Sequence, residues 1–454
     1  MIRIKPEIDL NLKCPCGRAQ VQPNALLLTG MHAMCKIACK ECGKEYFLEA
    51  PINAGAFYPG ILDAQTGARV DDLPFDNWYL HGLEDAFKGK KSVEIGFNIE
   101  KNRDFDPNKK VALLHCLDMT YGHAMYELFN AQYYIDRPDV DLIIVVQRNL
   151  RWLVPAGAAE VWVLDVPFSR ANDWNEWLAN RVQQELNRLP EQVFLCRTFV
   201  QADSSDYDIE RFSKVKPFPL NEWDARLEKP TVTFIWRTDR FWRKVLPKWL
   251  DNRISRKIAP KTIEKIKYRV QLNWLRKFAE ALRRAIPNLD FAISGMDERH
   301  QKFPDWIKDF RYPKHEDHTA REQCLRYAES HLVMGCNGSS LILPGCHSGA
   351  MLDIVPGDQW AVSAGSFAFR KTDLGDTHYR YTMVPAEVTI KRLVSITVAM
   401  LRDRSYIQMQ TSPPWRDHDA GLPPFSLSEK RIQVQELGRH FASEAGLVTL
   451  SRKK

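Results

Sequence analysis

The sequence lacks several features that would assign it to a special class of protein. No apolar run approaches the ~18 uninterrupted residues that a membrane-spanning helix needs. The first ten residues carry charges of both signs, where a signal peptide would have an apolar core. Internal repeats and low-complexity tracts are also missing. We therefore expect a cytoplasmic globular protein.

The composition is equally ordinary. Apolar residues make up 44% and charged residues 27% of the 454 residues, which excludes a mostly disordered chain. At ~150 residues per domain, the length predicts about three domains. The chain has 64 basic and 57 acidic residues, and a net charge of +7 on a chain of this length identifies no partner by itself.

The ten cysteines are unevenly distributed. Four of them form two close pairs near the N-terminus, each pair followed by glycine: Cys14, Cys16, Cys39 and Cys42. In a reducing compartment, clustered cysteines are typical of metal sites rather than of disulfides. Two tight turns with glycine suit thiolate ligands, so we predict a structural zinc in a small ribbon of short strands. Cys35 or His32 can substitute for one ligand, and free buried thiols are the alternative to a metal.

The sequence that follows alternates short apolar runs with amphipathic stretches. Residues 53–105 come first and predict only loops and short strands. Beyond them, buried strands are predicted at 111–117, 141–146, 159–164 and 193–196, with helices at 123–135 and 175–188. Such alternation is typical of a parallel sheet that helices cover on both faces.

A second alternation follows a proline-marked boundary. Its clearest element is the stretch 261–285, where apolar residues recur at helical spacing and predict one long helix. The predicted fold class is α/β, with two Rossmann-like domains preceded by a small zinc ribbon. The expected divisions are a ribbon at 1–52, a linker at 53–105, Rossmann-like domains at 106–228 and 229–385, and a helical tail at 386–454.

Residues suited to chemistry gather where strands of the second half end. The turn after the strand at 331–335 contains Asn337, Gly338, Ser339 and Ser340, and free N–H groups at such a helix start favour a phosphate. Arg237 ends another strand and can grip a phosphate as a planar fork, with Asp239 to hold it. Asp297 follows a third strand. The carboxyl ends of parallel strands meet at one edge of a sheet, which is where such folds bind ligands.

These motifs resemble those of GT-B glycosyltransferases, in particular the fucosyltransferase-like group related to α-1,6-fucosyltransferases. That group has an Arg-Arg-Thr-Asp-type strand end, a Thr-Asp-Asp strand end and a Gly-Ser turn, and the counterparts here are residues 236–239, 294–298 and 337–340. The segment 351–356 resembles the acidic strand that follows the turn, and 121–127 resembles a helix start in the first domain. Trp236 stands in place of the first paired arginine, so the donor can differ from GDP-fucose.

The resemblance implies metal-independent transfer of a sugar from a nucleoside diphosphate, possibly a GDP-linked one, to a glycan or lipid-linked acceptor. It places Arg237 on the β-phosphate of the leaving nucleotide and the turn at 338–340 on the diphosphate. It gives Asp297 and Asp353 contacts with the base or ribose. A general base is expected from the first half, with His123 favoured over Asp118 and Glu127.

Two other enzyme classes fit the sequence less well. The Asp-x-Asp pairs typical of metal-dependent glycosyltransferases here lie in loops or precede an apolar run. At 345–349 the serine stands one position away from the Gly-x-Ser-x-Gly pattern of serine hydrolases.

The serious alternative is a nucleic-acid-binding zinc-ribbon protein. The segment 237–284 has 16 Lys or Arg residues against 4 Asp or Glu residues. Four tryptophans are interleaved with these cations: Trp236, Trp242, Trp249 and Trp274. This pattern favours phosphate contact and base stacking. The same segment can also rest peripherally on an anionic membrane, or can be a solvated helix face over core tryptophans.

Overall fold

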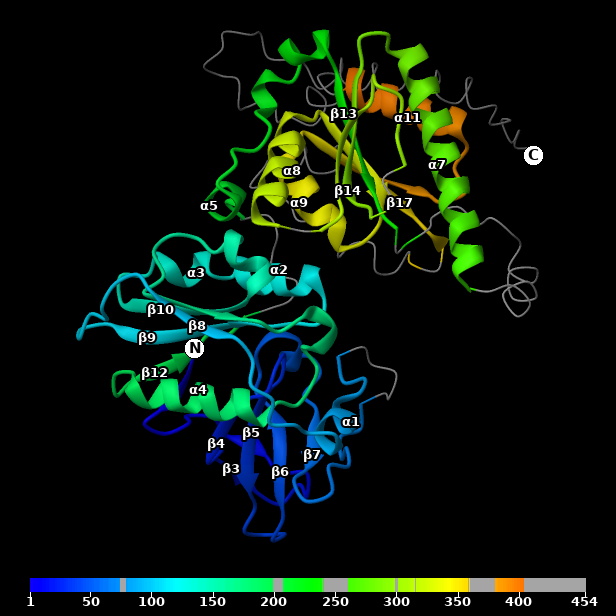
Figure 1. Cartoon of the computed structure of the whole chain (residues 1–454). Helices are drawn as coiled ribbons and strands as arrows, with labels where there is room; N and C mark the ends of the chain where they lie inside the picture. Colours follow the sequence, from blue (N-terminus) through cyan, green and yellow to red (C-terminus); the bar gives the residue numbers. More distant parts are fainter. Residues whose placement is uncertain are drawn as a thin grey trace, which may run out of the picture. The chain divides into compact units, whose positions relative to one another are not determined.

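The computed structural model describes residues 1–73, 79–198, 207–238, 240, 260–298, 301–314, 316–357, 359 and 380–403. Met1–Arg402 forms one compact unit, and Asp403–Lys454 is a separate one. The predicted helix near 428–445, Asp239, Trp242 and Trp249 lie outside the described residues. The architecture is mixed α/β, with two large sheets and smaller N-terminal ones (Figure 1).

The first large sheet has six strands in the order β1-β12-β9-β10-β11-β8. Their bounds are Ile2–Lys5, Val193–Leu195, Lys110–Cys116, Val140–Gln147, Glu160–Leu164 and Phe97–Lys101. The four central strands are parallel, as the apolar runs predicted, and β1 and β8 add antiparallel edges. Every residue of β10 is buried, because helices cover both faces of the sheet.

Helices α2 (Tyr121–Phe129) and α3 (Gln132–Ile135) lie on one face of this sheet, and α4 (Glu176–Arg188) lies on the other (Figure 1). The sequence predicted a single helix at 123–135, which is wrong. The helix is interrupted at Asn130, whose side-chain amide donates to the Tyr126 carbonyl at 2.7 Å. Such local side-chain bonds compete with helix continuation.

The second large sheet is entirely parallel, in the order β15-β14-β13-β16-β17-β18. Its strands are Lys308–Tyr312, Asp290–Met296, Thr231–Trp236, Leu332–Cys336, Ala350–Val355 and Tyr381–Pro385. Its helices are α7 (Pro260–Ala285), α8 (Asp317–Glu329), α9 (Ile342–His347) and α11 (Ile390–Arg402). The long helix predicted at 261–285 is thus present, with proline at its first position.

Two small antiparallel sheets occupy the N-terminal region. Strands β2 (Leu12–Lys13) and β3 (Gln20–Val21) form one, and β4 (Ala25–Leu28), β5 (Ala33–Ala38), β6 (Glu45–Glu49) and β7 (Ile61–Asp63) form the other. The short helices α1 and α5 span Leu83–Lys88 and Ile209–Ser213. Strand β1, although first in the chain, pairs with β12 of the large sheet.

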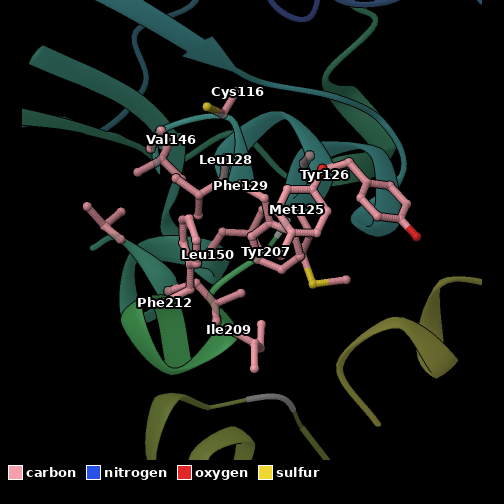
Figure 2. Packing of buried hydrophobic residues seen from close by; sticks show 14 of the residues in the cluster. Cys116, Met125, Tyr126, Leu128, Phe129, Val146, Leu150, Tyr207, Ile209 and Phe212 are labelled. Atoms are coloured by element: carbon pink, nitrogen blue, oxygen red, sulfur yellow. The ribbon is translucent and has the colours of Figure 1, made fainter. Parts of the chain in front are cut away.

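A continuous apolar cluster joins the first large sheet to its helices. In Figure 2, Met125 and Phe129 of α2 lie beside Tyr207 and Phe212 from the segment after β12. The Phe129 ring centroid is 4.9 Å from that of Tyr207 and equally far from that of Phe212. The same cluster includes Val333 and several other residues of the second half, so the two halves share buried apolar surface.

Within the described part of the chain, no helix combines the length and the apolar character needed to cross a membrane.

Candidate active site and metal centre

The two N-terminal cysteine pairs converge on one point. The sulfur atoms of Cys14, Cys16, Cys39 and Cys42 all lie within 4.8 Å of one another. The Sγ atoms of Cys14 and Cys42 are 3.9 Å apart, as are those of Cys16 and Cys39. Tetrahedral zinc with Zn–S bonds of ~2.3 Å requires sulfur atoms about 3.8 Å apart. The four cysteines can therefore hold a metal ion such as zinc.

The turns that carry these cysteines have the predicted form. Gly17 and Gly43 adopt φ values of 73° and 70°, which favour glycine. Their N–H groups donate to the carbonyls of Cys14 and Cys39 at 2.8 and 2.9 Å. Each pair is thus held on a tight loop with its sulfur atoms turned inward.

Cys35 and His32, the two residues that could replace a metal ligand, have other contacts. Cys35 is part of β5 and is buried in an apolar cluster. His32 is buried, with Nδ1 3.0 Å from Glu49 Oε2 and Nε2 2.7 Å from Asn172 Oδ1. Burial alone would lower the pKa of His32, but the Glu49 carboxylate outweighs it and raises the pKa. Tyr79 also donates to Glu49, so this buried network joins the N-terminal sheet to the loops that contain Tyr79 and Asn172.

A cavity of about 590 Å³ lies where strands of the second sheet end. Its polar and charged lining comes mainly from the second half: Arg237, Thr238, Lys314, Gln323, Ser339 and Ser340, with Asn149 from the first half. The first half also contributes an aromatic pair, Tyr121 and Phe168, whose ring centroids are 5.7 Å apart. Of the predicted phosphate residues, Arg237, Ser339 and Ser340 line this cavity at the carboxyl ends of the strands, and Asn337 and Gly338 do not.

Two arginines meet at the turn after β16. Arg237 Nη1 donates to the Asn337 carbonyl and to Ser340 Oγ, each at 3.2 Å. Arg240 Nη1 donates to the same carbonyl at 2.8 Å and to Asn337 Oδ1 at 3.1 Å. Gly338 has φ +127°, and a Cβ there would lie 2.5 Å from Arg237 Nη1. Only glycine allows guanidinium groups to approach the turn this closely.

Arg240 is a site residue that the sequence analysis missed. It follows Arg237 by three positions. Its place in the Arg-Thr-Asp-Arg run at the end of a strand is the sequence pattern that could have identified it as a site residue. Among the residues that line the cavity, Arg237 and Lys314 are charged and both are cationic. With no carboxylate in that lining, the cavity favours an anion.

Asp297 faces elsewhere. Its carboxylate accepts a hydrogen bond from Tyr268 at 2.7 Å and pairs with Arg311 in a fully buried ion pair. Those bonds fix the loop after β14 to α7, and Asp297 is not among the residues that line the cavity. A contact between Asp297 and a bound nucleotide remains an expectation without geometric support.

Asp353 is buried in β17, opposite Gly335 of β16. Neither carboxylate oxygen has a hydrogen-bond partner in the described part of the chain. Burial raises the pKa of Asp353 to about 7, although Arg240 opposes this shift. Burying a carboxyl group without hydrogen-bond partners costs free energy. Groups with such perturbed pKa values are often found at functional sites.

The three candidate bases lie together at the start of α2. His123 Nδ1 is 3.4 Å from Asp118 Oδ1, and their side chains are 24% and 1% exposed. Asp118 is held in turn by the Thr120 N–H at 2.6 Å. Glu127 is fully buried one turn later, and burial, reinforced by Asp118, raises its pKa well above the usual range. His123 is therefore the accessible base, and Asp118 can orient it.

The first turn of α2 contacts the turn after β16, which contains Gly338 and Ser339. A Cβ added at Gly122 would lie 2.6 Å from Cβ of Ser339. The backbone next to His123 is therefore in contact with the turn that Arg237 and Arg240 grip. Sequence reasoning predicted both groups; the structure places the start of α2 against this turn, while His123 and Asp118 are not among the residues that line the cavity.

We expect the purified chain to contain about one zinc ion per molecule. Cys39→Ser should lose the metal and lower the melting temperature, since three thiolates leave the site open. Metal content by plasma mass spectrometry and thermal unfolding would measure both. Cys35→Ala is the control, because it removes a neighbouring thiol outside the cluster and should keep the zinc. A wild-type chain without metal after expression with zinc would contradict the assignment.

Asp353 should make stability depend on pH. Its folded pKa of about 7 lies above the ordinary value of 3.8, so the native state holds an extra proton between these values. The free energy of unfolding contributed by this group therefore falls as pH rises through that window. In Asp353→Asn this pH-dependent loss of stability should be absent. The free energy of unfolding of the variant minus that of the wild type should therefore rise by up to about 4 kcal/mol from pH 4 to pH 8. Urea titrations at several pH values would show it, with exposed Glu329→Gln as control. Parallel pH profiles for wild type and Asp353→Asn would disprove the effect.

Comparison with known proteins adds no assignment to this geometry. The chain matches no model of a known protein family, and a search among curated proteins found no significant match.

Proposed function

We propose that the protein is a glycosyltransferase of the GT-B type, which transfers a sugar from a nucleoside-diphosphate donor to an acceptor hydroxyl. The observation that carries the proposal is that Arg237 and Arg240 both donate to the Asn337 carbonyl, beside a cavity whose charged lining residues, among those the structure describes, are the cations Arg237 and Lys314. In this proposal the two large sheets are the cores of two Rossmann-like domains. The all-parallel second sheet supports it, because such sheets bind nucleotides at the carboxyl ends of their strands.

The proposed chemistry needs stabilisation of a departing diphosphate. When the bond between the anomeric carbon and the phosphate oxygen breaks, that oxygen gains negative charge. Arg237 lies at the cavity edge and Arg240 lies beside it on the same turn, so both can neutralise this charge. The Ser339 and Ser340 hydroxyls can add neutral hydrogen bonds. Preorganised donors of this kind act most strongly in the transition state, and they provide the positive charge that a metal supplies in other glycosyltransferases.

The acceptor must lose a proton as its oxygen attacks the anomeric carbon. His123 can take that proton, and the Asp118 carboxylate can stabilise the resulting imidazolium at 3.4 Å. Glu127 is fully buried, and burial raises its pKa, so in this proposal it serves the packing of the helix rather than the transfer. The aromatic pair Tyr121 and Phe168 offers a stacking surface for a sugar ring of a glycan or lipid-linked acceptor. In the proposal, the metal centre is structural and remote from the reaction.

Arg237→Ala should weaken binding of the donor. Loss of a charge-assisted hydrogen bond costs ~1.5–3 kcal/mol, so Kd should rise about 10- to 100-fold. A panel of nucleoside-diphosphate sugars, tested by thermal shift and then by calorimetry, would identify the donor and measure this loss. Arg226→Ala is the matched control, because Arg226 is an arginine outside the cavity lining that pairs with Glu222 on the surface. If no nucleoside-diphosphate sugar stabilises the wild type, the proposed function fails.

His123→Gln should lower turnover without weakening the donor. General-base catalysis contributes about 10²- to 10⁴-fold, so kcat should drop within that range while the donor Kd stays constant. Release of nucleoside diphosphate with the identified donor would give kcat. His318→Gln is the control, because His318 is an exposed histidine of the second half. An unchanged kcat in His123→Gln would assign the base to another residue.

A further inference from the structure

Helix α7 carries a stripe of four cations on its solvent side. Lys265, Arg269, Arg276 and Arg283 follow one another at intervals of four, seven and seven residues. Such intervals keep side chains on one face of a helix. Arg276 is half-buried and the other three are exposed. At ~1.5 Å per residue, this cationic stripe is about 27 Å long.

An adjacent side of α7 belongs to the core. Its buried side chains Leu275, Phe278 and Leu282 contribute to the apolar cluster under the second sheet, and the buried Leu272 marks the border between the core and the stripe. Figure 1 shows α7 on the side of this sheet away from α8 and α9. The helix is therefore fixed in its rotation, and the cationic stripe can only face outward.

Among the described residues, the stripe cations form no ion pairs of the kind that neighbouring cations make, although the exposed Glu280 lies between Arg276 and Arg283 on the same side of the helix. In the same half, Lys308 and Arg326 pair with Asp290 at 2.7 and 3.0 Å, and Arg311 pairs with Asp297. Across the described residues, none of the four stripe cations forms an ion pair with a carboxylate. Lys265 and Arg269, one turn apart, repel each other and destabilise the helix. Such a row is costly for the free protein, which suggests an anionic ligand.

Two of the three guanidinium groups in the stripe are already positioned. Arg276 donates to the Lys302 carbonyl at 2.6 Å and lies 5.7 Å from the centroid of Phe303. Arg283 lies 4.7 Å from the centroid of Trp306. Side chains held over aromatic rings lose less conformational freedom when they bind, and each still has N–H groups for a phosphate.

We propose that the cationic stripe binds the phosphodiester backbone of a nucleic acid, a property beyond the proposed sugar transfer. One strand presents a phosphate about every 3.4 Å in B-form geometry, so about eight phosphates match the length of the stripe. An anionic membrane fits less well, because a membrane-surface helix inserts its apolar face. Here that face is in the core, and among the described residues of α7 the single exposed large hydrophobic side chain is Ile266, at 44%.

The test is the salt dependence of binding to a fluorescently labelled single-stranded oligonucleotide. Each phosphate neutralised contributes about 0.7 to the slope of log Kobs against log salt concentration. Replacing Lys265, Arg269, Arg276 and Arg283 with Gln should therefore reduce the magnitude of that slope by about three. The control carries the same loss of charge on four exposed lysines of the first half: Lys13, Lys40, Lys88 and Lys101. It should keep the wild-type slope, and so should Arg237→Ala.

Equal slopes for the stripe variant and its control would overturn the proposal, as would a wild type that binds no oligonucleotide at low salt. Binding to phosphatidylserine vesicles that depends on the stripe, without oligonucleotide binding, would assign the surface to a membrane instead. If the fourfold variant does not fold, as judged by circular dichroism, Lys265→Gln with Arg269→Gln should still reduce the slope by about 1.4. These results are independent of whether a nucleotide sugar binds.

Discussion

The candidate site depends on the close approach of two guanidinium groups to one peptide turn. Arg237 and Arg240 both donate to the Asn337 carbonyl, and the missing side chain at Gly338 leaves them room. The partial negative charge of that carbonyl oxygen offsets part of the electrostatic repulsion between the two arginines. Its hydrogen bonds also fix their positions before a ligand binds. A preorganised pair is more effective than two mobile cations, because binding then costs less ordering of side chains. The contact of Gly122 with Ser339 adds the base-bearing helix to the same turn.

Two buried carboxyl groups lower the stability of the fold, because burial removes them from water. Asp353 and Glu127 are both almost fully buried, each has an oxygen without a described partner, and burial raises the pKa of each. An apolar residue at either position would avoid this desolvation cost. The Arg240 charge opposes the rise of the Asp353 pKa, whereas the Asp118 charge adds to the rise of the Glu127 pKa. The two groups therefore differ: the neighbouring charge favours ionisation of Asp353 and disfavours ionisation of Glu127.

Local patterns in the sequence predicted the local structure well. Cysteine spacing identified the four residues of the metal cluster, and helical spacing of apolar residues identified α7. Features that depend on distant contacts were not predictable in this way. Asp297 follows a strand as Arg237 does, but its partner Arg311 is on another strand, and no local signal shows that the pair is buried. The pairing of β1 with β12, and the arrival of Arg240 at the turn, likewise depend on the assembled sheets.

Two groups of cationic side chains, one beside the cavity and one on α7, differ in their geometry. At the cavity, Arg237 and Arg240 converge on a single carbonyl, which suits a compact anion such as a diphosphate. On α7, cations are spaced along a line and face solvent, which suits an extended polyanion. Salt screens exposed charges within about 10 Å at 0.1 M, whereas partly enclosed charges are screened much less. Ionic strength should therefore act strongly on the helix surface and weakly on the cavity, so the two kinds of binding can be distinguished in one protein.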